Sequence, residues 1–489
     1  MCGVVGVIAP RSCPPIAAQE NYHALLTLQH RGQDSSGILA FDYQQRQFHL
    51  HKGPGAVAQA FNQEKLEELQ GGMAIGHTRY ATVGDNHPRN LQPMVMGHPH
   101  GVGMVHNGNI VNYHMLTDQL REEEEQHFLS GSDLELLLNL WSVHYTSKKL
   151  EGGGDYLTYC QHAVSKIFET AIGAYSVIGL IANKGLFAFR DPNGIRPLVL
   201  GQKVNGEDSS YAVASESTAL TFTGHKIIRS INPGELLFIT LDGELHSFDL
   251  RPAASQDSHC MFEWVYFSSA NSEVDECPIY DTRFRLGEAL AAQTSELIKS
   301  GEIDPEVVIP IPDTSRTAAI ALASKLNLPY REGLLKNRYS QRSFILPSQQ
   351  DRERLINHKL SPIRSEIEGK SILLVDDSVV RGTTSKRILE LLRHHGAKKI
   401  YVAVACPPIK HPCYYGIDFP LSSELIAANS TPKDVAEQIG ADRVIFLTIN
   451  ELQNSLNSKG LCLACLNKKY PTSISASEQF TKQRIEDGR

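Results

Sequence analysis

The chain has few cysteines, no long apolar run and little net charge for its length. Nine cysteines among 489 residues are too few for a disulfide-stabilised scaffold. No apolar segment approaches the roughly 20 residues that span a bilayer, and the first residues lack the basic start and unbroken apolar core of a signal peptide. A formal net charge of -7 gives no electrostatic case for nucleic acid or an anionic membrane. We therefore expect a cytoplasmic protein whose cysteines serve as thiols, catalytic groups or metal ligands.

The patterning divides the chain into two parts, as a length of 489 residues predicts. Up to about residue 250, short apolar runs such as GVVGVIA and AYSVIGLIA are separated by turn residues and indicate strands. Segments 19–30 and 133–145 carry apolar residues at helical spacing, and an Asp242-Gly243 pair predicts a hairpin. Residues 2–250 are therefore expected to form an α+β domain with mainly antiparallel sheets.

Beyond the polar segment 251–259, which has no periodicity, the order of elements changes. VVIPIP precedes a helical stretch at 314–325, and SILLVDD precedes first SKRILELLRHHG and then IYVAVAC. Strand, helix and strand in this order predict a parallel sheet with right-handed crossovers, so residues 251–466 are expected to form an α/β domain. Residues 467–489 are polar and are expected to form a surface tail.

The motif SILLVDDSVVRGTTS at 371–385 carries the first chemical information. In an open parallel sheet, ligands lie beyond the carboxyl ends of the strands, where Asp376 and Asp377 are expected. Adjacent carboxylates repel each other unless a cation or the hydroxyls of a sugar lie between them. The following SVVRGTTS offers hydroxyls and unpaired N–H groups at a helix start, which suit a phosphate. The residues indicate a site for a phosphate with a diol or Mg²⁺, although an acid pair that only caps a helix is the alternative for the pair alone.

The whole string resembles the phosphoribosyl pyrophosphate (PRPP) signature of the type I phosphoribosyltransferases. The resemblance implies that Asp376 and Asp377 hold the ribose hydroxyls and, together with Thr314, Mg²⁺. It also implies that the loop 381–385 holds the 5-phosphate. The pyrophosphate would meet IPDTS and the basic segment LLKNRYSQRSF, where a mobile lid is also expected. The implied PRPP-binding residues are Thr314, Ser315, Lys336, Arg338, Arg342, Asp376, Asp377, Ser378, Arg381, Gly382, Thr383, Thr384 and Ser385.

At the other end of the chain, Cys2 directly follows Met1 in MCGVVGVIAP. With Met1 removed, Cys2 carries both a thiol and an α-amine. An α-amine has a pKa of roughly 8, so it can accept the thiol proton without a histidine partner. A cysteine after Met1 is by itself weak evidence for catalysis, because any residue can follow the initiator methionine. Only the removal of Met1 is expected to be needed for maturation.

Three further motifs supply the groups that hydrolysis of the glutamine amide requires. GHTRYATVG contains Arg79, HNGN contains Asn107 with Gly108, and GSD contains Asp133. Such groups can bind an α-carboxylate, donate to a tetrahedral oxyanion and bind an α-amine, respectively. In this order after Cys2, with LQHRGQDSSG at 28–37 between Cys2 and the first of them, these motifs resemble the class II, N-terminal nucleophile glutamine amidotransferase domain. The implied catalytic residues are Cys2, Asn107 and Gly108, and the implied glutamine-binding residues are Arg79 and Asp133.

Taken together, the two halves resemble the glutamine PRPP amidotransferases. Matching stretches run from Cys2 to about Tyr470 and include FRDPNGIRPLVLG at 189–201 and VASES at 213–217. The resemblance implies that ammonia released at Cys2 crosses a channel to C1 of the ribose, giving phosphoribosylamine, glutamate and pyrophosphate in the first committed step of purine synthesis. It further implies purine nucleotide inhibitors and a homotetramer. We expect the glutaminase to be competent only once PRPP has closed its loop.

Four of the cysteines fall in contexts that hold a 4Fe-4S cluster in some members of this family. They are Cys260 in HCMFEWVYF, Cys413 in HPCYYGID, and Cys462 with Cys465 in CLAC. The resemblance implies a 4Fe-4S cluster, although four thiolates also suit a tetrahedral zinc. Two segments depart from the family. FSSANS at 267–272 replaces F-[AS]-R-P-D-S and lacks its arginine and acid, and DRERLINHKL is less basic than its counterpart.

Two other functions are alternatives to this one. A different class II amidotransferase, such as a sugar-phosphate aminating enzyme, shares the first half but lacks VDDSVVRGTTS. A non-catalytic PRPP sensor with an inactive glutaminase half would not need to keep the nucleophile, both clamps and the acid pair, all of which this sequence retains.

Overall fold

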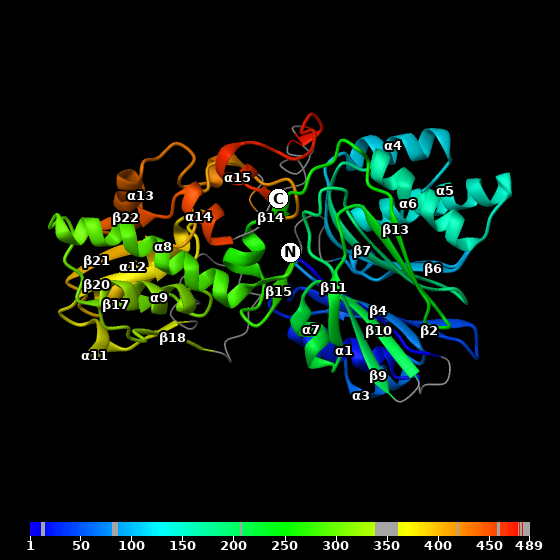
Figure 1. Ribbon diagram of the computed structural model, residues 1–489, viewed down its shortest axis with the longest axis horizontal. Helices are drawn as coiled ribbons and strands as arrows, with labels where there is room; N and C mark the ends of the chain where they lie inside the picture. Colours follow the sequence, from blue (N-terminus) through cyan, green and yellow to red (C-terminus); the bar gives the residue numbers. More distant parts are fainter. Residues whose placement is uncertain are drawn as a thin grey trace.

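The computed structural model describes residues 1–10, 15–80, 87–205, 208–337, 360–417, 419, 421–456, 460–477, 479 and 482. The chain forms two lobes that lie side by side (Figure 1). The first lobe contains antiparallel sheets with helices, and the second contains a parallel sheet, which confirms the predicted fold class. In the part of the chain that the structure describes, no helix has the length and apolar character needed to cross a membrane.

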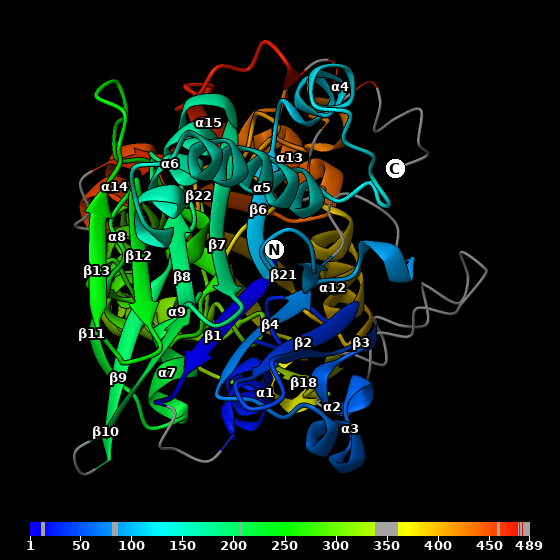
Figure 2. The same ribbon diagram turned by 90° about the vertical axis from the view of Figure 1, so that its right-hand side faces the viewer.

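The first lobe is a sandwich of two antiparallel sheets. The seven-stranded sheet has the order β11 (Lys226–Ser230), β9 (Val199–Asn205), β10 (Asp208–Ala214), β1 (Gly3–Ile8), β4 (Met73–Arg79), β2 (Ser35–Asp42) and β3 (Gln47–Pro54). The six-stranded sheet has the order β13 (Leu245–Asp249), β12 (Glu235–Thr240), β8 (Gly185–Arg190), β7 (Gly173–Ile181), β6 (Val102–Ile110) and β5 (Met94–Met96). Helices cover both outer faces, so four layers result (Figure 2).

The outer layers are short to medium helices packed through their apolar faces. The seven-stranded sheet is covered by α1 (Ala17–Thr27), α2 (Val57–Ala60), α3 (Gln63–Glu68) and α7 (Ser217–Phe222). The six-stranded sheet is covered by α4 (Tyr113–Glu123), α5 (Asp133–Glu151) and α6 (Tyr156–Thr170). The two helices expected from the sequence are present as α1 and α5, and the expected hairpin joins β12 to β13.

Alternation along β1 shows how the layers arise. Val4 and Ile8 lie in the core between the two sheets, whereas Val5 and Val7 lie in the core under α1. Successive side chains of a strand point to opposite faces, so an apolar strand buried on both faces needs a covering layer on each side. This places β1 in the middle of the sandwich and brings the start of the chain to its edge, between the two lobes (Figure 1).

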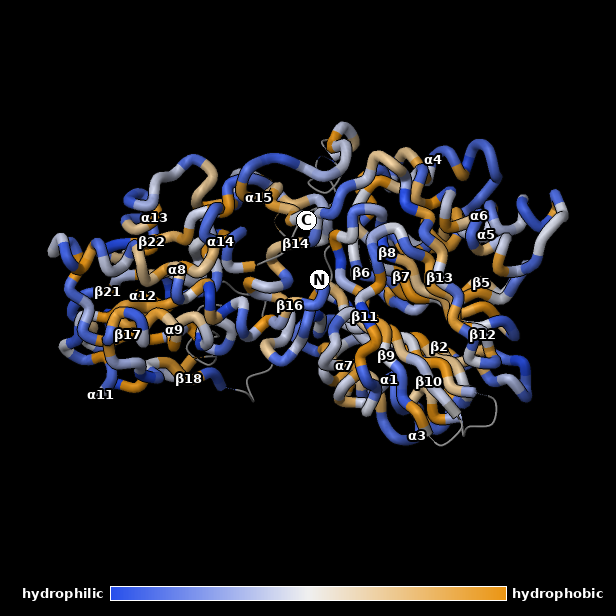
Figure 3. The backbone as a smooth tube through the Cα atoms, viewed as in Figure 1, coloured by the Kyte–Doolittle hydropathy of each residue, from blue (hydrophilic) through white to orange (hydrophobic). Residues whose placement is uncertain are grey.

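The second lobe is built on the parallel strands β17 (Val307–Pro310), β20 (Ser371–Asp376), β21 (Lys399–Val404) and β22 (Arg443–Phe446). Its longer helices are α8 (Ile279–Lys299), α9 (Arg316–Leu326), α12 (Thr383–His394), α13 (Pro432–Ile439) and α14 (Ile449–Leu456). The hydrophobic segments of both lobes lie along their strands (Figure 3). As predicted, VVIPIP, SILLVDD and IYVAVAC contain strands, and most of 314–325 lies in α9.

Shorter elements complete the second lobe. They are β14 (His259–Cys260), η2 (Glu263–Phe267), β15 (Glu273–Val274), β16 (Cys277–Pro278), β18 (Leu334–Lys336), β19 (Leu360–Pro362), α11 (Arg364–Ile367), η3 (Ser422–Glu424), β23 (Leu461–Cys462) and α15 (Ala464–Asn467). The domain boundary at 251–259 stays a prediction. In the segment expected to be a tail, Tyr470 donates a hydrogen bond to the carbonyl of Pro412 at 2.8 Å.

The close approach of the two sheets can be tested at Gly6. A Cβ added there would lie 2.6 Å from Cγ2 of Ile178 and 2.9 Å from Cδ1 of Leu186. Gly6→Ala is therefore expected to destabilise the first lobe by about 1–3 kcal/mol through overpacking. The control is Gly97→Ala, since a Cβ at Gly97 meets no atom within 4 Å. Urea unfolding followed by circular dichroism measures both, and equal midpoints would contradict this packing.

Candidate functional site

Cys2 is held at the start of β1 by contacts from both sheets of the first lobe. Its backbone N–H donates to Oδ1 of Asn107 at 3.2 Å, and its thiol lies 3.8 Å from the carbonyl oxygen of Tyr80. Asn107 belongs to β6 of the second sheet, so the sandwich brings together two residues 105 positions apart. The predicted nucleophile and the predicted oxyanion-hole residue are thus neighbours.

The amide of Asn107 has a donor to spare. Its side chain is buried, and among the described residues its Nδ2 has no hydrogen-bond partner. A buried amide nitrogen of this kind carries a desolvation cost that a substrate oxygen can relieve. The next residue, Gly108, has φ +153°, and a Cβ there would lie 1.9 Å from the carbonyl oxygen of Ala174. The backbone beside Asn107 therefore admits only glycine.

Arg79 and Asp133 are both buried in this lobe. Arg79 is the last residue of β4, and Asp133 is the first residue of α5, whose N-cap Ser132 accepts the N–H of Leu134. Burial acts to raise the pKa of Asp133, but His106 and the N–H of Ile110 outweigh it, with a smaller contribution from Arg79. The net pKa is lowered, so the carboxylate is ionised near neutral pH.

In the second lobe, the acid pair lies at the carboxyl end of β20, as predicted. The N–H of Asp377 donates to Oδ1 of Asp376 at 2.9 Å, and Oγ of Ser378 donates to Oδ1 of Asp377 at 2.8 Å. Burial raises the pKa of Asp376 well above its ordinary value, and the charge of Asp377 adds to the rise. Burial also raises the pKa of Asp377, to about 6. Both carboxyls therefore hold their protons more strongly than isolated carboxyls do, and the charge of Arg283 partly offsets this effect at Asp377.

The loop after the acid pair ends in a helix start with free donors. Gly382 has a left-handed conformation and precedes α12 without a side-chain cap. Helix N-termini of this type bind anions, because their first N–H groups lack partners within the helix. The carboxyl end of β17 lies next to that of β20, so IPDTS faces the same region. Lys336 is 3.1 Å from Asp313 there, whereas Arg338 and Arg342 lie outside the described residues.

One cavity joins the two halves. It has a volume of about 530 Å³ and is lined from the first lobe by Met1, His30, Arg31, Gly32, Gln33 and Tyr80. Its lining from the second lobe includes Thr314, Lys336, Asp376, Asp377, Ser378, Arg381, Gly382, Thr383, Thr384 and Ser385. Tyr80, whose carbonyl contacts the Cys2 thiol, and ten of the predicted PRPP residues therefore line a common space, although Cys2 and Ser315 are not part of its lining.

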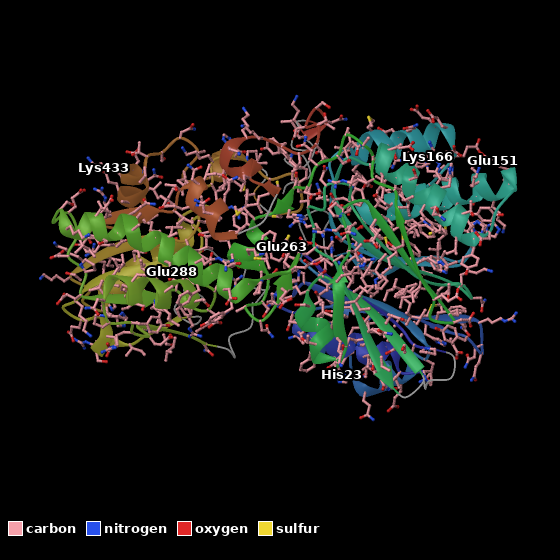
Figure 4. All side chains as sticks on the ribbon, viewed as in Figure 1. His23, Glu151, Lys166, Glu263, Glu288 and Lys433 are labelled. Carbon is pink, nitrogen blue, oxygen red and sulfur yellow. The ribbon has the colours of Figure 1, made fainter. Side chains whose placement is uncertain are left out.

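Buried charges connect the lobes beside this cavity. Arg31 is fully buried and donates to the carbonyl of Cys2 at 3.0 Å, to Glu216 at 2.5 Å and to Glu263 at 2.8 Å. Figure 4 places Glu263 at the junction of the two lobes. Burial alone would raise the pKa of Glu216, but the contacts with His30 and Arg31 hold this pKa well below its usual range. The sequence motifs contained these residues, yet no role was predicted for them.

The departing segment FSSANS contributes to the same charged network. Oγ of Ser268 donates to Glu263 at 2.9 Å, and Oγ of Ser272 donates to Glu216 at 2.8 Å. The backbone N–H of Ser269 also donates to Glu216, at 2.9 Å. Each buried carboxylate thus receives hydroxyl or amide donors in addition to arginine, as buried charges require.

The four cysteines with matching contexts surround one small apolar cavity. Cys260 in β14 lies opposite Cys462 in the parallel strand β23. Cys465 lies in α15, and Cys413 lies in a loop. All four line a cavity of about 10 Å³ together with Tyr415, Tyr470 and aliphatic side chains. In the described part of the chain, no group of three ligand side chains is close enough to hold a metal ion as it stands. The four thiols thus share one cavity, and their role as metal ligands stays a prediction.

Two regions of the chain match known domain families. Residues 77–222 match the family described as glutamine amidotransferase domain, and residues 279–418 match the family described as phosphoribosyl transferase domain. These regions contain Arg79, Asn107 and Asp133 in the first case and the acid pair in the second.

Similarity to whole proteins extends over both lobes. A protein of Pasteurella multocida named amidophosphoribosyltransferase is 39% identical over 494 residues, covering 100% of this chain and 95% of the relative. Its Escherichia coli counterpart is 40% identical over 464 residues, covering 94% and 89%. The solved glutamine PRPP amidotransferase of B. subtilis, complexed with ADP and GMP, superposes with a TM-score of 0.84 at 36% identity, covering 97% of this chain and 98% of that one. Because both lobes match in sequence and in structure along nearly their whole length, the protein belongs to the amidophosphoribosyltransferase family.

Proposed function

We propose that the protein is an amidophosphoribosyltransferase that hydrolyses glutamine at Cys2 and transfers the ammonia to C1 of PRPP. The products are 5-phosphoribosylamine, glutamate and pyrophosphate, in the first committed step of purine biosynthesis. The observation that carries this proposal is the cavity of about 530 Å³, whose lining comes from the surroundings of Cys2 on one side and from the acid pair on the other. A passage between the two sites that excluded bulk water would keep ammonia unprotonated and hence nucleophilic.

In the first half-reaction, Cys2 acts as the nucleophile after Met1 has been removed. Burial lowers the pKa of the Met1 amine to about 5, and the same surroundings would keep an amine on Cys2 neutral. A neutral amine can take the thiol proton as the sulfur attacks the amide carbon of glutamine. Nδ2 of Asn107 and the N–H of Gly108 then stabilise the oxyanion, and Arg79 and Asp133 bind the α-carboxylate and the α-ammonium.

In the second half-reaction, Asp376 and Asp377 hold the ribose hydroxyls, and the loop from Arg381 to Ser385 binds the 5-phosphate. Thr314, Ser315 and Lys336 meet the pyrophosphate, for which Arg338 and Arg342 stay proposed ligands. Asp376, Asp377 and Thr314 would hold Mg²⁺, which would neutralise charge on the leaving pyrophosphate. C1 gains positive character as this bond stretches, so placement of ammonia matters more than a general base.

The finer features of the proposal concern cofactor, regulation and assembly. The residues that would hold a 4Fe-4S cluster, with zinc as the alternative, are Cys260, Cys413, Cys462 and Cys465. We propose that this metal site stabilises the fold. Purine nucleotides are proposed as feedback inhibitors, in keeping with the ADP and GMP named for the B. subtilis structure. We further propose a homotetramer in the cytoplasm.

Replacing the nucleophile separates the two half-reactions. Cys2→Ala is expected to lower glutamine-dependent synthesis by about a thousandfold or more, because no other group can form the thioester. Synthesis from added ammonia should continue, since the PRPP site lies in the other lobe. The measurements are glutamate and pyrophosphate release with each nitrogen source. The control is Cys277→Ala, and glutamine-dependent synthesis by Cys2→Ala at the rate of this control would overturn the proposal.

The raised pKa values of the acid pair predict a pH dependence of Mg²⁺ binding. Carboxyls with raised pKa values are protonated more readily in the folded protein, so protons compete with Mg²⁺ as the pH falls through about 6. We expect the apparent dissociation constant for Mg²⁺, in the presence of PRPP, to be about tenfold higher at about pH 5.5 than at about pH 7.5. Calorimetric titration measures it. Asp377→Asn should weaken binding and flatten this dependence, and an unchanged slope would assign the titration to PRPP itself.

The four-cysteine site is tested by metal analysis of anaerobically purified protein. The wild type is expected to contain iron and sulfide, with a visible charge-transfer absorption, or else one zinc per chain. Cys462→Ser should lose most of this metal, whereas Cys160→Ala, which changes a buried thiol of the first lobe, should keep it. Wild-type protein that contains neither metal would refute the site.

A further inference from the structure

A chain of three polar side chains runs behind the predicted oxyanion hole. Gln92 lies before β5, His106 lies in β6, and Asp133 begins α5; all three are buried. Side chains alternate along β6, so Asn107 faces Cys2 while His106 points to the opposite side, toward α5. The motif HNGN therefore carries a second polar group, for which the sequence predicted no role.

The hydrogen bonds of Gln92 fix the protonation state of the histidine ring. The backbone N–H of His106 donates to Oε1 of Gln92 at 2.8 Å, which identifies the amide oxygen. Nε2 of Gln92 is then the amide nitrogen, and it lies 3.0 Å from Nδ1 of His106. An amide nitrogen can only donate, so Nδ1 is the acceptor and the ring proton is on Nε2.

The protonated nitrogen faces the carboxylate that is proposed to bind glutamine. Nε2 of His106 lies 3.2 Å from Oδ2 of Asp133, although the N–H is not aligned for a full hydrogen bond. The same oxygen accepts the N–H of Ile110 at 3.3 Å. Two donors thus converge on one oxygen of a buried carboxylate, which restricts its rotation and stabilises its charge.

We propose that His106 and Gln92 are positioning residues that hold the Asp133 carboxylate ready for the α-ammonium group of glutamine. Gln92 selects the tautomer of His106 in which Nε2 carries the proton. This N–H then faces Oδ2 of Asp133. The inference rests on the proposed function, in which Asp133 recognises the α-ammonium. Neither residue takes part in bond cleavage, so both act on substrate recognition and leave the chemical step unchanged.

Two substitutions of equal polarity test the proposal. In His106→Gln, the new amide reaches the place of Nε2 and keeps a donor for Asp133. In His106→Asn, the shorter amide reaches only the place of Nδ1 and the contact with Asp133 is lost. The KM for glutamine is expected to rise about tenfold or more in His106→Asn, the size of a lost hydrogen bond to a charged group, with kcat nearly unchanged. His106→Gln should restore most of the affinity.

A substrate without the α-amine provides a second readout. Glutaramate, 4-carbamoylbutanoate, has the side-chain amide of glutamine and its carboxylate but no ammonium group. His106→Asn should reduce the preference for glutamine over glutaramate by about the factor by which the KM rises. A purely structural defect would slow both substrates equally. Gln92→Met, which leaves the histidine in place, should reduce the preference in the same direction and serves if the histidine variants do not fold.

The outcomes separate this inference from the proposed function. Equal KM values for His106→Asn and His106→Gln, or equal losses on both substrates, would overturn the positioning role. Wild-type protein that releases no glutamate from glutamine would instead overturn the proposed function. Synthesis from ammonia and alkylation of Cys2 by iodoacetamide, measured in parallel, report whether the PRPP site and the nucleophile are intact in each variant.

Discussion

The buried guanidinium of Arg31 links the predicted nucleophile directly to the second lobe. It holds the carbonyl of Cys2 and, at the same time, Glu216 of its own lobe and Glu263 of the other. Removing one partner of such a buried pair costs about 3–5 kcal/mol, because the remaining charge is left uncompensated. The position of the nucleophile is therefore tied to the position of η2. Arg31 contacts both Glu263 and Cys2, so a movement of Glu263 would displace Cys2 through this one side chain. The contact is a physical basis for coupling between the proposed active sites.

The two carboxylate sites on either side of this contact are prepared in opposite ways. Donors converge on Asp133 and lower its pKa, so it is ionised before any ligand arrives. Asp376 and Asp377 lie together with few donors, and their pKa values are raised. The first site is thus ready for an organic cation such as an α-ammonium. The second holds its protons more strongly, so a bound cation would favour its ionised form.

The parts of the site that the sequence predicted are those that local rules determine. An apolar strand followed by acids places Asp376 at a strand end, and a serine cap before an apolar period places Asp133 at a helix start. Arg31 and Glu263 are 232 residues apart and meet only because two lobes pack together. No periodicity records such a contact. The link from Gln92 to His106 was not predicted for a related reason. It joins a loop to a strand through one side-chain amide, which contacts the ring and the backbone N–H of His106.

The segment FSSANS shows how the interface accommodates a departure from the family pattern. The pattern that this segment resembles has an arginine at the position of Ser269 and an acid at the position of Asn271. In this chain, Oγ of Ser269 donates to Asn271, and the side-chain amide of Asn271 donates to Thr218. Ser268 and Ser272, which match the pattern, donate to Glu263 and Glu216. Neutral hydroxyls donate to these carboxylates without adding charge, so the buried arginines keep the electrostatic balance. Because Ser268 and Ser272 match the pattern, the departure leaves in place the hydroxyl donors to the carboxylates that hold Arg31.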